Sequence, residues 1–229
     1  MNPPNHIAII PDGNRRWARQ NNKMEFEGHK RAFEEVLPDL IRKADQLGVK
    51  YFTFWSLSTE NLVKRSKQEI EALFSLAKHF YKKGLRDFNE EGVRMQFIGD
   101  LAGLPDDIQK IIATSIEETK NNKKITLVIA INYGGRDELM RALKKVITMN
   151  YLATSVNATN FDQFLDTKGI PEPELIIRTG GEKRLSGLMP WQSVYSELYF
   201  SDLMFPDFSP AELEKAVEDF YNRKRNFGK

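Results

Sequence analysis

The first candidate for chemistry follows the apolar run His6–Ile10, where positions 11 to 16 read Pro-Asp-Gly-Asn-Arg-Arg. The segment sets the carboxylate of Asp12 beside a glycine, an amide and two arginines. These residues make a good turn, because proline fixes φ and glycine and asparagine accept positive φ. A strand that turns into a helix would instead offer free backbone N–H groups to an anion. The segment therefore predicts either a solvated turn or a phosphate-binding helix start.

Three further segments combine small polar residues with cations, and each follows another apolar run. They are Ser58-Thr59-Glu60-Asn61 with Lys64 and Arg65, Asn132-Tyr133-Gly134-Gly135-Arg136, and the stretch from Arg178 to Ser186. Ligands of open parallel sheets bind at the carboxyl ends of the strands, so we expect all four segments to converge there. Arginine forks and backbone N–H groups match phosphate oxygens. The four segments together predict a polyanionic ligand.

The elements that must position these segments are short apolar strands that alternate with helices. We predict six strands: His6–Ile10, Val49–Leu57, Val93–Gly99, Ile125–Asn132, Leu175–Arg178 and Leu198–Phe200. Apolar residues recur at helical spacing over 33–47, 70–88, 108–116 and 139–146, and Pro38 predicts a kink. This alternation is typical of an α/β fold with a mostly parallel sheet of about six strands, flanked by helices. Without repeats or linkers, the 229 residues predict a single domain over 1–229.

Composition and absent motifs exclude several classes of protein. The net charge of +2 and the lack of a known binding motif argue against a nucleic-acid partner. The absence of cysteine excludes disulfides, thiolate metal sites and a cysteine nucleophile. Neither a GxxxxGK[ST] nor a GxGxxG motif occurs, and the three histidines lack metal-site spacing. No signal-like start or membrane-spanning apolar run is present, so we expect a cytoplasmic protein.

Six segments resemble those of the cis-prenyltransferases, the undecaprenyl diphosphate synthase family, in type and order. They are HIAIIPDGNRRWA, EGHKRAF, FWSLSTEN, INYGGRDEL, IIRTGGEKRLSGLMPWQ and YSELYFSDLMFPDF. The resemblance implies a Mg²⁺-dependent prenyltransferase that elongates chains in cis. It would condense isopentenyl diphosphate onto an allylic diphosphate, typically farnesyl diphosphate. The resemblance also implies a homodimer, and an apolar tunnel for the growing chain between the sheet and two long helices.

The same resemblance assigns roles to individual residues. Asp12 would be the catalytic carboxylate that works with Mg²⁺, Glu197 the second metal-linked carboxylate, and Asn61 the proton-handling residue. The allylic diphosphate would be bound by Gly13, Asn14, Arg15, Arg16, Trp17, His29, Ser58, Thr59, Glu60 and Arg65. Isopentenyl diphosphate would be bound by Arg178, Arg184, Leu185 and Ser186. These types suit the reaction, because fixed cations stabilise the leaving diphosphate and Mg²⁺ prefers oxygen ligands.

Several positions depart from the family pattern. Glu25 stands where the family often has an arginine, for which Lys23 is the candidate substitute. Leu62 replaces a tryptophan, and Lys183 replaces a histidine near the metal. The C-terminal Arg-x-Gly, which reaches into a neighbouring subunit in the family, reads Asn226-Phe227-Gly228 with Arg225 one place early.

Product length is predicted from two features of the tunnel region. Ser56 is small at a position where bulk tends to shorten products, and the helix expected over 67–92 is rich in Phe and Leu. Both favour a long polyprenyl diphosphate, the precursor of a carrier lipid. An apolar tunnel mouth would place the protein peripherally at the inner face of a membrane.

Two alternatives stay open: irregular or short-chain coupling on the same fold, and a non-catalytic partner subunit. The retained Asp12, Arg178 and Glu197 argue against the first, and the Asp-Gly-Asn and Arg-Thr-Gly-Gly-Glu groups against the second.

Overall fold

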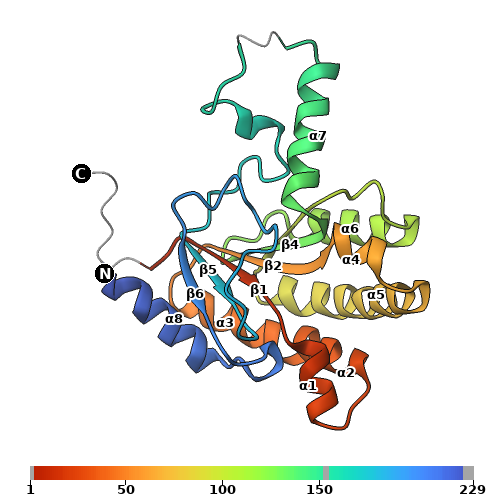
Figure 1. Cartoon of the computed structure of the whole chain (residues 1–229), viewed down its shortest axis with the longest axis vertical. Coiled ribbons are helices and arrows are strands. Elements are labelled where there is room, and N and C mark those ends of the chain that lie inside the picture. Colours follow the sequence, from red (N-terminus) through yellow and green to blue (C-terminus); the bar gives the residue numbers. More distant parts are fainter. Residues whose placement is uncertain (1–2, 152–154, 224–229) are drawn as a thin grey trace.

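A six-stranded sheet forms the centre of the computed structural model, which describes residues 3–151 and 155–223 (Figure 1). The strand order is β3-β4-β2-β1-β5-β6, and each neighbouring pair is parallel. The α/β fold and the number of strands are therefore confirmed. The strands are β1 (His6–Ile10), β2 (Tyr51–Ser58), β3 (Arg94–Ile98), β4 (Thr126–Tyr133), β5 (Leu175–Arg178) and β6 (Glu197–Phe200).

Helices connect the strands and follow the last one. They are α1 (Asn14–Gln20), α2 (Glu25–Arg31), α3 (Leu37–Gln46), α4 (Thr59–Lys64), α5 (Lys67–Glu90), α6 (Asp106–Thr119), α7 (Gly135–Thr148) and α8 (Pro210–Asn222). Three short turns complete the described elements: η1 (Ala32–Val36), η3 (Phe161–Phe164) and η4 (Phe205–Asp207). Within the described residues, no helix is long and apolar enough to cross a bilayer.

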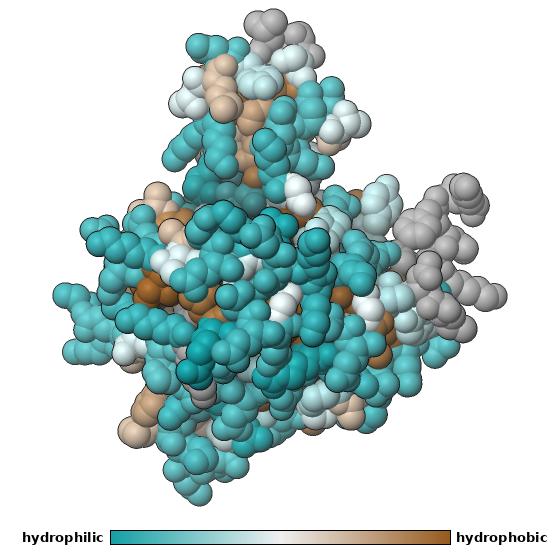
Figure 2. Space-filling view, turned by 180° about the vertical axis from the view of Figure 1, so that it is seen from behind, coloured by the Kyte–Doolittle hydropathy of each residue, from teal (hydrophilic) through white to brown (hydrophobic). Residues whose placement is uncertain are grey.

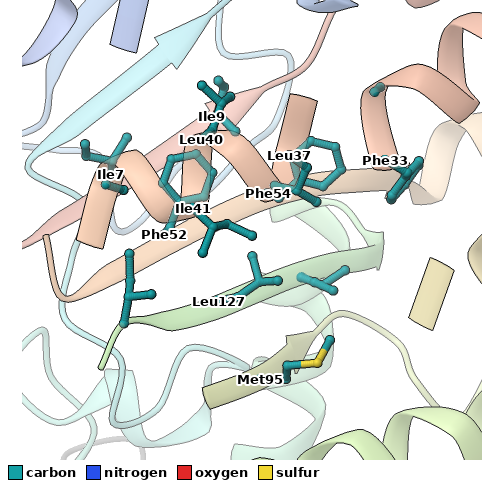
Figure 3. Close-up of a cluster of buried hydrophobic side chains, with 14 of the residues drawn as sticks. Ile7, Ile9, Phe33, Leu37, Leu40, Ile41, Phe52, Phe54, Met95 and Leu127 are labelled. Carbon is teal, nitrogen blue, oxygen red and sulfur yellow. The ribbon is translucent and has the colours of Figure 1, made fainter. Parts of the chain in front are cut away.

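The two faces of the sheet are covered differently because alternate strand residues point to opposite sides. Ile7 and Ile9 of β1 face a large core with Phe52 and Phe54, where α3, α5, α6 and α8 pack (Figure 3). Ala8 and Ile10 face a smaller core that is closed by Leu188 and Met189 of a loop. Burial on both faces explains why the strands are almost continuously apolar.

The helix changes type just before Pro38, where the sequence predicts a kink. Residues Ala32–Val36 form one turn of π-helix, and α3 begins at Leu37 with Pro38 in its first turn. Proline has no N–H to donate within a helix, so it is tolerated where a new helix starts. The predicted single helix over 33–47 is therefore two segments, and the first turns Phe33 toward the sheet core.

An irregularity in β2 lies next to the carboxyl edge of the sheet. Trp55 pairs with Ala130, but Leu57 pairs with Ile131, so Ser56 has no partner in the register. An extra residue of this kind bends a strand and re-aims its side chains. The bend falls where β2 leads into α4.

The buried His6 predicts how stability depends on pH. Its Nδ1 lies 2.6 Å from the Pro171 carbonyl oxygen, and Nε2 lies 2.7 Å from the Thr53 hydroxyl. A carbonyl only accepts, so Nδ1 donates and Nε2 accepts in a neutral ring. Burial lowers the pKa of His6 to about 4, against an ordinary value of 6.5. Stability is full above pH 6.5 and is lost as pH falls toward 4, because only the unfolded chain gains the proton.

In His6→Asn the side chain keeps a donor near Pro171 but does not titrate. Between pH 7 and pH 4, we expect the free energy of unfolding of this variant to fall by up to about 3 kcal/mol less than that of the natural chain. Urea unfolding of the variant and the natural chain between pH 4 and 7 measures the difference. His79→Asn, at an exposed histidine, is the control and should leave the slope unchanged. Equal slopes for His6→Asn and the natural chain would contradict the assignment of a neutral, buried ring.

Candidate functional site

A cavity of about 470 Å³ lies at the carboxyl edge of the sheet, where β1, β2 and β5 end. One side of it is polar and cationic, and the other is aromatic. The lining residues are Ile10, Pro11, Asp12, Gly13, Asn14, Arg15, Arg16, His29, Phe33, Phe54, Trp55, Ser56, Ser58, Glu60, Asn61, Lys64, Arg65, Arg178 and Ser186. Three of the four polar segments predicted to converge therefore do so.

Asp12 is held from both sides by the ends of two strands. Its backbone N–H donates to the Thr179 hydroxyl at 2.9 Å, and that hydroxyl donates back to the Asp12 carbonyl at 2.9 Å. Each carboxylate oxygen also has a donor: the Gly13 N–H reaches Oδ1 at 2.7 Å, and the Arg178 guanidinium reaches Oδ2 at 2.8 Å. The position of the carboxylate is therefore fixed before any ligand binds.

Arg178 is the buried cation of the site, since only 5% of its side chain is exposed. One terminal nitrogen donates to Asp12, and the other donates to the Arg184 carbonyl and the Ser186 hydroxyl at 2.5 and 2.6 Å. Its Nε is buried and has no hydrogen-bond partner among the described residues. A buried charge needs such partners, and an unused donor beside a cavity is available to an anion.

The start of α1 is built by close backbone approaches. Gly13 has φ +100°, and a Cβ there would lie 2.9 Å from the side chain of Met204, so only glycine suits the turn. The first intrahelical hydrogen bond runs from the Trp17 N–H to the Gly13 carbonyl, so the preceding three N–H groups have no partner within α1. Asn14 is buried, and its Oδ1 has no partner among the described residues. Of the two predictions for this segment, the helix start is the one the structure shows.

His29 contributes an uncharged ring to the site. Burial, and then the positive charges of Arg65 and Arg15, lower the pKa of His29 to about 4. Its Nε2 is buried and has no partner within the described part of the chain. Burial and the charge of Arg15 also lower the pKa of Arg65. The ring can therefore exchange hydrogen bonds with a ligand, while the positive charge comes from the arginines.

The residues after β2 are positioned by the cap of α4. The Ser58 hydroxyl accepts a hydrogen bond from the Asn61 N–H at 3.1 Å, which fixes the first turn. Glu60, Asn61 and Arg65 line the cavity, as expected for binding residues. Thr59 does not line it: its buried hydroxyl would lie 3.3 Å from a Cβ added at Gly134, beside the start of α7.

Three other residues with predicted binding roles lie outside the cavity. Trp17 anchors α1 instead, because its Nε1–H donates to Asp207 at 2.8 Å and the Arg31 guanidinium stacks 4.9 Å from its ring. The Arg184 side chain is exposed and bound to Glu182, so only its carbonyl reaches the site. Leu185 packs in the smaller core.

Glu197 is not brought to Asp12 within the chain. It pairs in register with Leu175 at the amino end of β5, whereas Ile10 pairs with Arg178 at the carboxyl end. Its carboxylate accepts a hydrogen bond from Arg223 at 2.8 Å. A metal site shared by Asp12 and Glu197 of one chain is therefore excluded by the register. Residues 225–228, with the departures noted there, lie outside the described residues.

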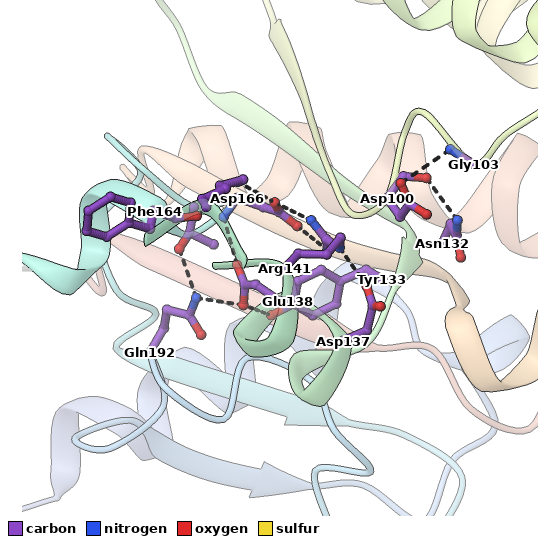
Figure 4. Close-up of polar contacts among 12 residues, drawn as sticks. Asp100, Gly103, Asn132, Tyr133, Asp137, Glu138, Arg141, Phe164, Asp166 and Gln192 are labelled. Atoms are coloured by element: carbon purple, nitrogen blue, oxygen red, sulfur yellow. Dashed lines mark hydrogen bonds and ion pairs between the residues drawn. The ribbon is translucent and has the colours of Figure 1, made fainter. Parts of the chain in front are cut away.

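The polar segment after β4 does not line the cavity but supports a loop that does. This supporting role was not predicted from the sequence. The Tyr133 hydroxyl donates to the buried Glu138 at 2.7 Å, and the Gln192 amide donates to the same oxygen at 3.1 Å (Figure 4). The Gly135 N–H donates to the Gly187 carbonyl at 2.8 Å, and a Cβ on Gly135 would lie 2.0 Å from Pro190. Two adjacent glycines before an acidic helix start were the available signal.

These contacts hold the loop that carries Ser186 in a strained backbone conformation. Ser186 and Met189 have φ +53° and +46°, a backbone region that costs energy for residues other than glycine. Burial raises the pKa of Glu138 from its ordinary value, and no basic side chain donates a hydrogen bond to its carboxylate among the described contacts. The Tyr133–Glu138–Gln192 contacts are therefore structural support for the partners of Arg178.

The protein residues of the cavity would coordinate a metal ion only together with oxygen atoms of a bound ligand. Among the described residues, no group of three or more His, Cys, Asp or Glu side chains could hold a metal. The cavity does present the Asp12 carboxylate and the unpartnered Oδ1 of Asn14. Mg²⁺ takes one or two protein oxygens and completes its shell with phosphate oxygens and water. The donor set is compatible with that arrangement.

Fold and cavity define an α/β protein that binds a phosphate-bearing ligand at the carboxyl edge of a parallel sheet. Comparison with known proteins makes this definition specific. The family model "Putative undecaprenyl diphosphate synthase" matches residues 10–228. The chain is 42% identical to an isoprenyl transferase of Clostridium perfringens, over 98% of this chain and 90% of that protein. It is also 42% identical to a nerylneryl diphosphate synthase of Solanum lycopersicum, over 98% of this chain and 71% of that protein.

Solved structures agree. A lavandulyl diphosphate synthase from Lavandula x intermedia, in complex with dimethylallyl diphosphate, matches with a TM-score of 0.93 and 33% identity, over 99% of this chain and 98% of that one. A "probable undecaprenyl diphosphate synthase" from Campylobacter jejuni matches with a TM-score of 0.82 and 33% identity over the whole of both chains. The chain therefore belongs to the undecaprenyl diphosphate synthase family of cis-prenyltransferases.

The approach of α2 to α1 gives a prediction at Gly28, beside His29. A Cβ at Gly28 would lie 2.1 Å from the Asn14 carbonyl oxygen, a backbone atom of the cavity wall. We expect Gly28→Ala to lower the free energy of unfolding by about 1–3 kcal/mol, because α1 and α2 must separate. Gly84→Ala is the matched control: its Cβ would lie 3.3 Å from the movable ring of Phe88. Urea unfolding should show that variant unchanged or up to about 1 kcal/mol more stable.

Proposed function

We propose that the protein elongates an allylic diphosphate, with farnesyl diphosphate as starter, by adding isopentenyl diphosphate units in cis. The product would be a long polyprenyl diphosphate, the precursor of a carrier lipid. The observation that carries the proposal is the ion pair of Asp12 with the buried Arg178, in a cavity lined by both cationic and aromatic residues. Such a cavity suits a ligand with a diphosphate head and a prenyl tail.

The chemistry separates two diphosphate groups along the cavity. The allylic carbon–oxygen bond breaks, the diphosphate leaves with the electron pair, and the double bond of isopentenyl diphosphate forms the new carbon–carbon bond. Loss of a proton from the added unit restores a double bond. Arg15, Arg16 and Arg65 would bind the leaving group, whose growing negative charge they stabilise. Arg178 and Ser186 would bind isopentenyl diphosphate, and Asn61, which lines the same cavity, would handle the proton.

Mg²⁺ is part of the proposal, as the ion that neutralises diphosphate charge and polarises the breaking bond. Asp12 would hold it, and the buried, unpartnered amide oxygen of Asn14 and the carboxylate of Glu60 are further oxygen donors among the residues that line the cavity. Lys183 is exposed, outside the cavity, and as a cation offers no ligand. Glu197 could serve a metal only across two chains.

Asp12→Ala tests the proposed catalytic carboxylate. We expect turnover to fall by about a thousandfold or more, because the variant removes the charge that organises Arg178 and the metal. Incorporation of labelled isopentenyl diphosphate into farnesyl diphosphate with Mg²⁺ measures it. Circular dichroism and thermal unfolding serve as controls for folding. Near-normal turnover by a folded Asp12→Ala protein would refute the assignment.

A tunnel for the growing chain is proposed along the aromatic side of the cavity. Phe33 and Phe54 line the cavity, and their ring centroids lie 5.2 Å apart. Phe33 also packs 5.2 Å from Phe80, which lines a second cavity of about 430 Å³ between α3 and α5. One aromatic contact therefore separates the two cavities. A long product would need Phe80 to move aside.

The same contact favours a second candidate function, the synthesis of short products. A cavity of about 470 Å³ that ends at Phe33 and Phe54 suits few isoprene units. Similarity to proteins named nerylneryl and lavandulyl diphosphate synthase is consistent with this alternative. Ser56, which lines the cavity with a small side chain, favours growth.

Phe80→Leu tests whether this contact limits the product. Removing ring volume from a well-packed wall leaves room toward the second cavity, so we expect the product distribution to shift to longer chains. Chromatography of the extracted products by length measures the shift. Phe164→Leu is the control, because Phe164 is buried in a separate cluster and lines neither cavity. An unchanged distribution in Phe80→Leu would contradict the proposed path.

A homodimer and peripheral membrane contact complete the proposal. For the dimer, the support is α7, which projects from the body (Figure 1). Met140, Leu143 and Ile147 form an exposed apolar stripe on it at helical spacing. Figure 2 shows apolar surface among the polar residues of the projecting part. A second copy that presents the same stripe would bury it. For the membrane, the support is Val63 and Phe26, exposed on two helices that also contribute to the cavity.

A further inference from the structure

Glu25 does not line the cavity but contacts Arg15, which does, and the proposed function does not use it. It begins α2, where the family resemblance leads one to expect an arginine. Its two carboxylate oxygens accept from two arginines of α1: the Arg15 Nε–H donates to Oε2, and the Arg19 Nε–H donates to Oε1 at 2.8 Å. Residues four apart on a helix share a face, so one carboxylate meets both side chains.

The Arg15 guanidinium is held from its other end as well. Its NH1 lies 3.7 Å from Oε1 of Glu69, in the first turn of α5. The second oxygen of Glu69 accepts from the Ser66 backbone N–H and hydroxyl, each at 3.1 Å, so the capping box fixes this carboxylate. Arg15 lines the cavity and Arg19 does not. Two carboxylates on separate helices therefore orient one cationic side chain of the site.

Electrostatics explain why Arg15 needs these carboxylates. Arg15 and Arg65 face the same space, and the Arg15 charge adds to burial in lowering the pKa of Arg65. Like charges in a partly buried site repel, which would favour Arg15 orientations that point into solvent. Glu25 offsets that repulsion through Nε, and among the described contacts the terminal nitrogens of Arg15 have only the longer ion pair with Glu69, at 3.7 Å.

We propose that Glu25 is a positioning residue of the allylic diphosphate site: it holds Arg15 so that the terminal guanidinium nitrogens meet the diphosphate. An indirect contact thus replaces the direct one that an arginine at position 25 would make. The inference rests on the proposed function, which identifies the anion. Lys23 does not supply the missing cation, because it lies outside the cavity with its Nζ 3.9 Å from Glu27.

Stability alone cannot separate this role from that of an ordinary surface ion pair. The Arg15 and Glu25 side chains are 41% and 36% exposed, and exposed pairs contribute little to folding. A positioning role changes the affinity for one substrate and leaves the other unaffected. The two Michaelis constants therefore carry the test.

The experiment compares Glu25→Gln, a neutral variant of the same shape, with the natural chain. We expect KM for the allylic diphosphate to rise about three- to tenfold, the effect of freeing one long side chain. KM for isopentenyl diphosphate and kcat should stay within about twofold, since the other site and the chemical step are untouched. Arg19→Gln is the matched control, because it removes the partner outside the cavity and should leave both constants unchanged.

Three results would overturn the inference: an unchanged allylic KM in Glu25→Gln, a lower one, or an equal rise in Arg19→Gln. The natural chain is assayed first, so that a failure of the proposed function is seen separately. Should the natural chain incorporate no isopentenyl diphosphate, that function fails. Calorimetric titration with inorganic pyrophosphate then decides on Glu25: weaker binding by Glu25→Gln supports positioning of Arg15, and equal binding refutes it.

Discussion

The ion pair between Asp12 and Arg178 is the contact on which the rest of the site depends. It joins the carboxyl ends of β1 and β5, where a nearly buried guanidinium requires both a counter-charge and hydrogen-bond acceptors. Asp12 supplies the charge, and the Arg184 carbonyl and Ser186 hydroxyl supply the acceptors. Removing either partner would leave a charge exposed to a low dielectric. The start of α1 and the loop at 184–186 are thereby fixed to one point of the sheet.

The cavity wall divides into two kinds of surface because two layers of the fold meet there. Strand ends and the start of α1 contribute arginines and polar groups, whereas the core under α3 and α5 contributes Phe33 and Phe54. A diphosphate head and an apolar tail have opposite solvation requirements, and this wall meets both at once. Under the proposed function, the aromatic contact between Phe33 and Phe80 would limit how far an apolar tail extends.

Precision in this site comes from residues that never touch the cavity. Thr179 brackets the Asp12 backbone, Gly28 lets α2 approach α1, and the Tyr133–Glu138–Gln192 contacts hold a loop with positive φ at Ser186 and Met189. A strained loop keeps one conformation only when its surroundings determine it. At the opposite rim, Glu25 and Glu69 orient Arg15 through ion pairs that are open to solvent.

The sequence by itself determined the α/β class, the parallel strands and the turn at 11–16 that starts a helix, because the spacing of apolar residues and the chemistry of turns are local properties. Pro38 also marked the place where the helix changes type. Only the tertiary structure decided which polar segments reach the cavity: Asn132–Arg136 supports a loop, Trp17 anchors a helix, and Glu197 lies at the far end of its strand. Strand register and packing between distant segments determine where these residues lie. Neither can be predicted from the type of a residue. From the sequence, Glu25 in place of an arginine indicates only a lost contact. In the structure, α1 and α2 lie side by side, and Glu25 is the counter-ion of Arg15.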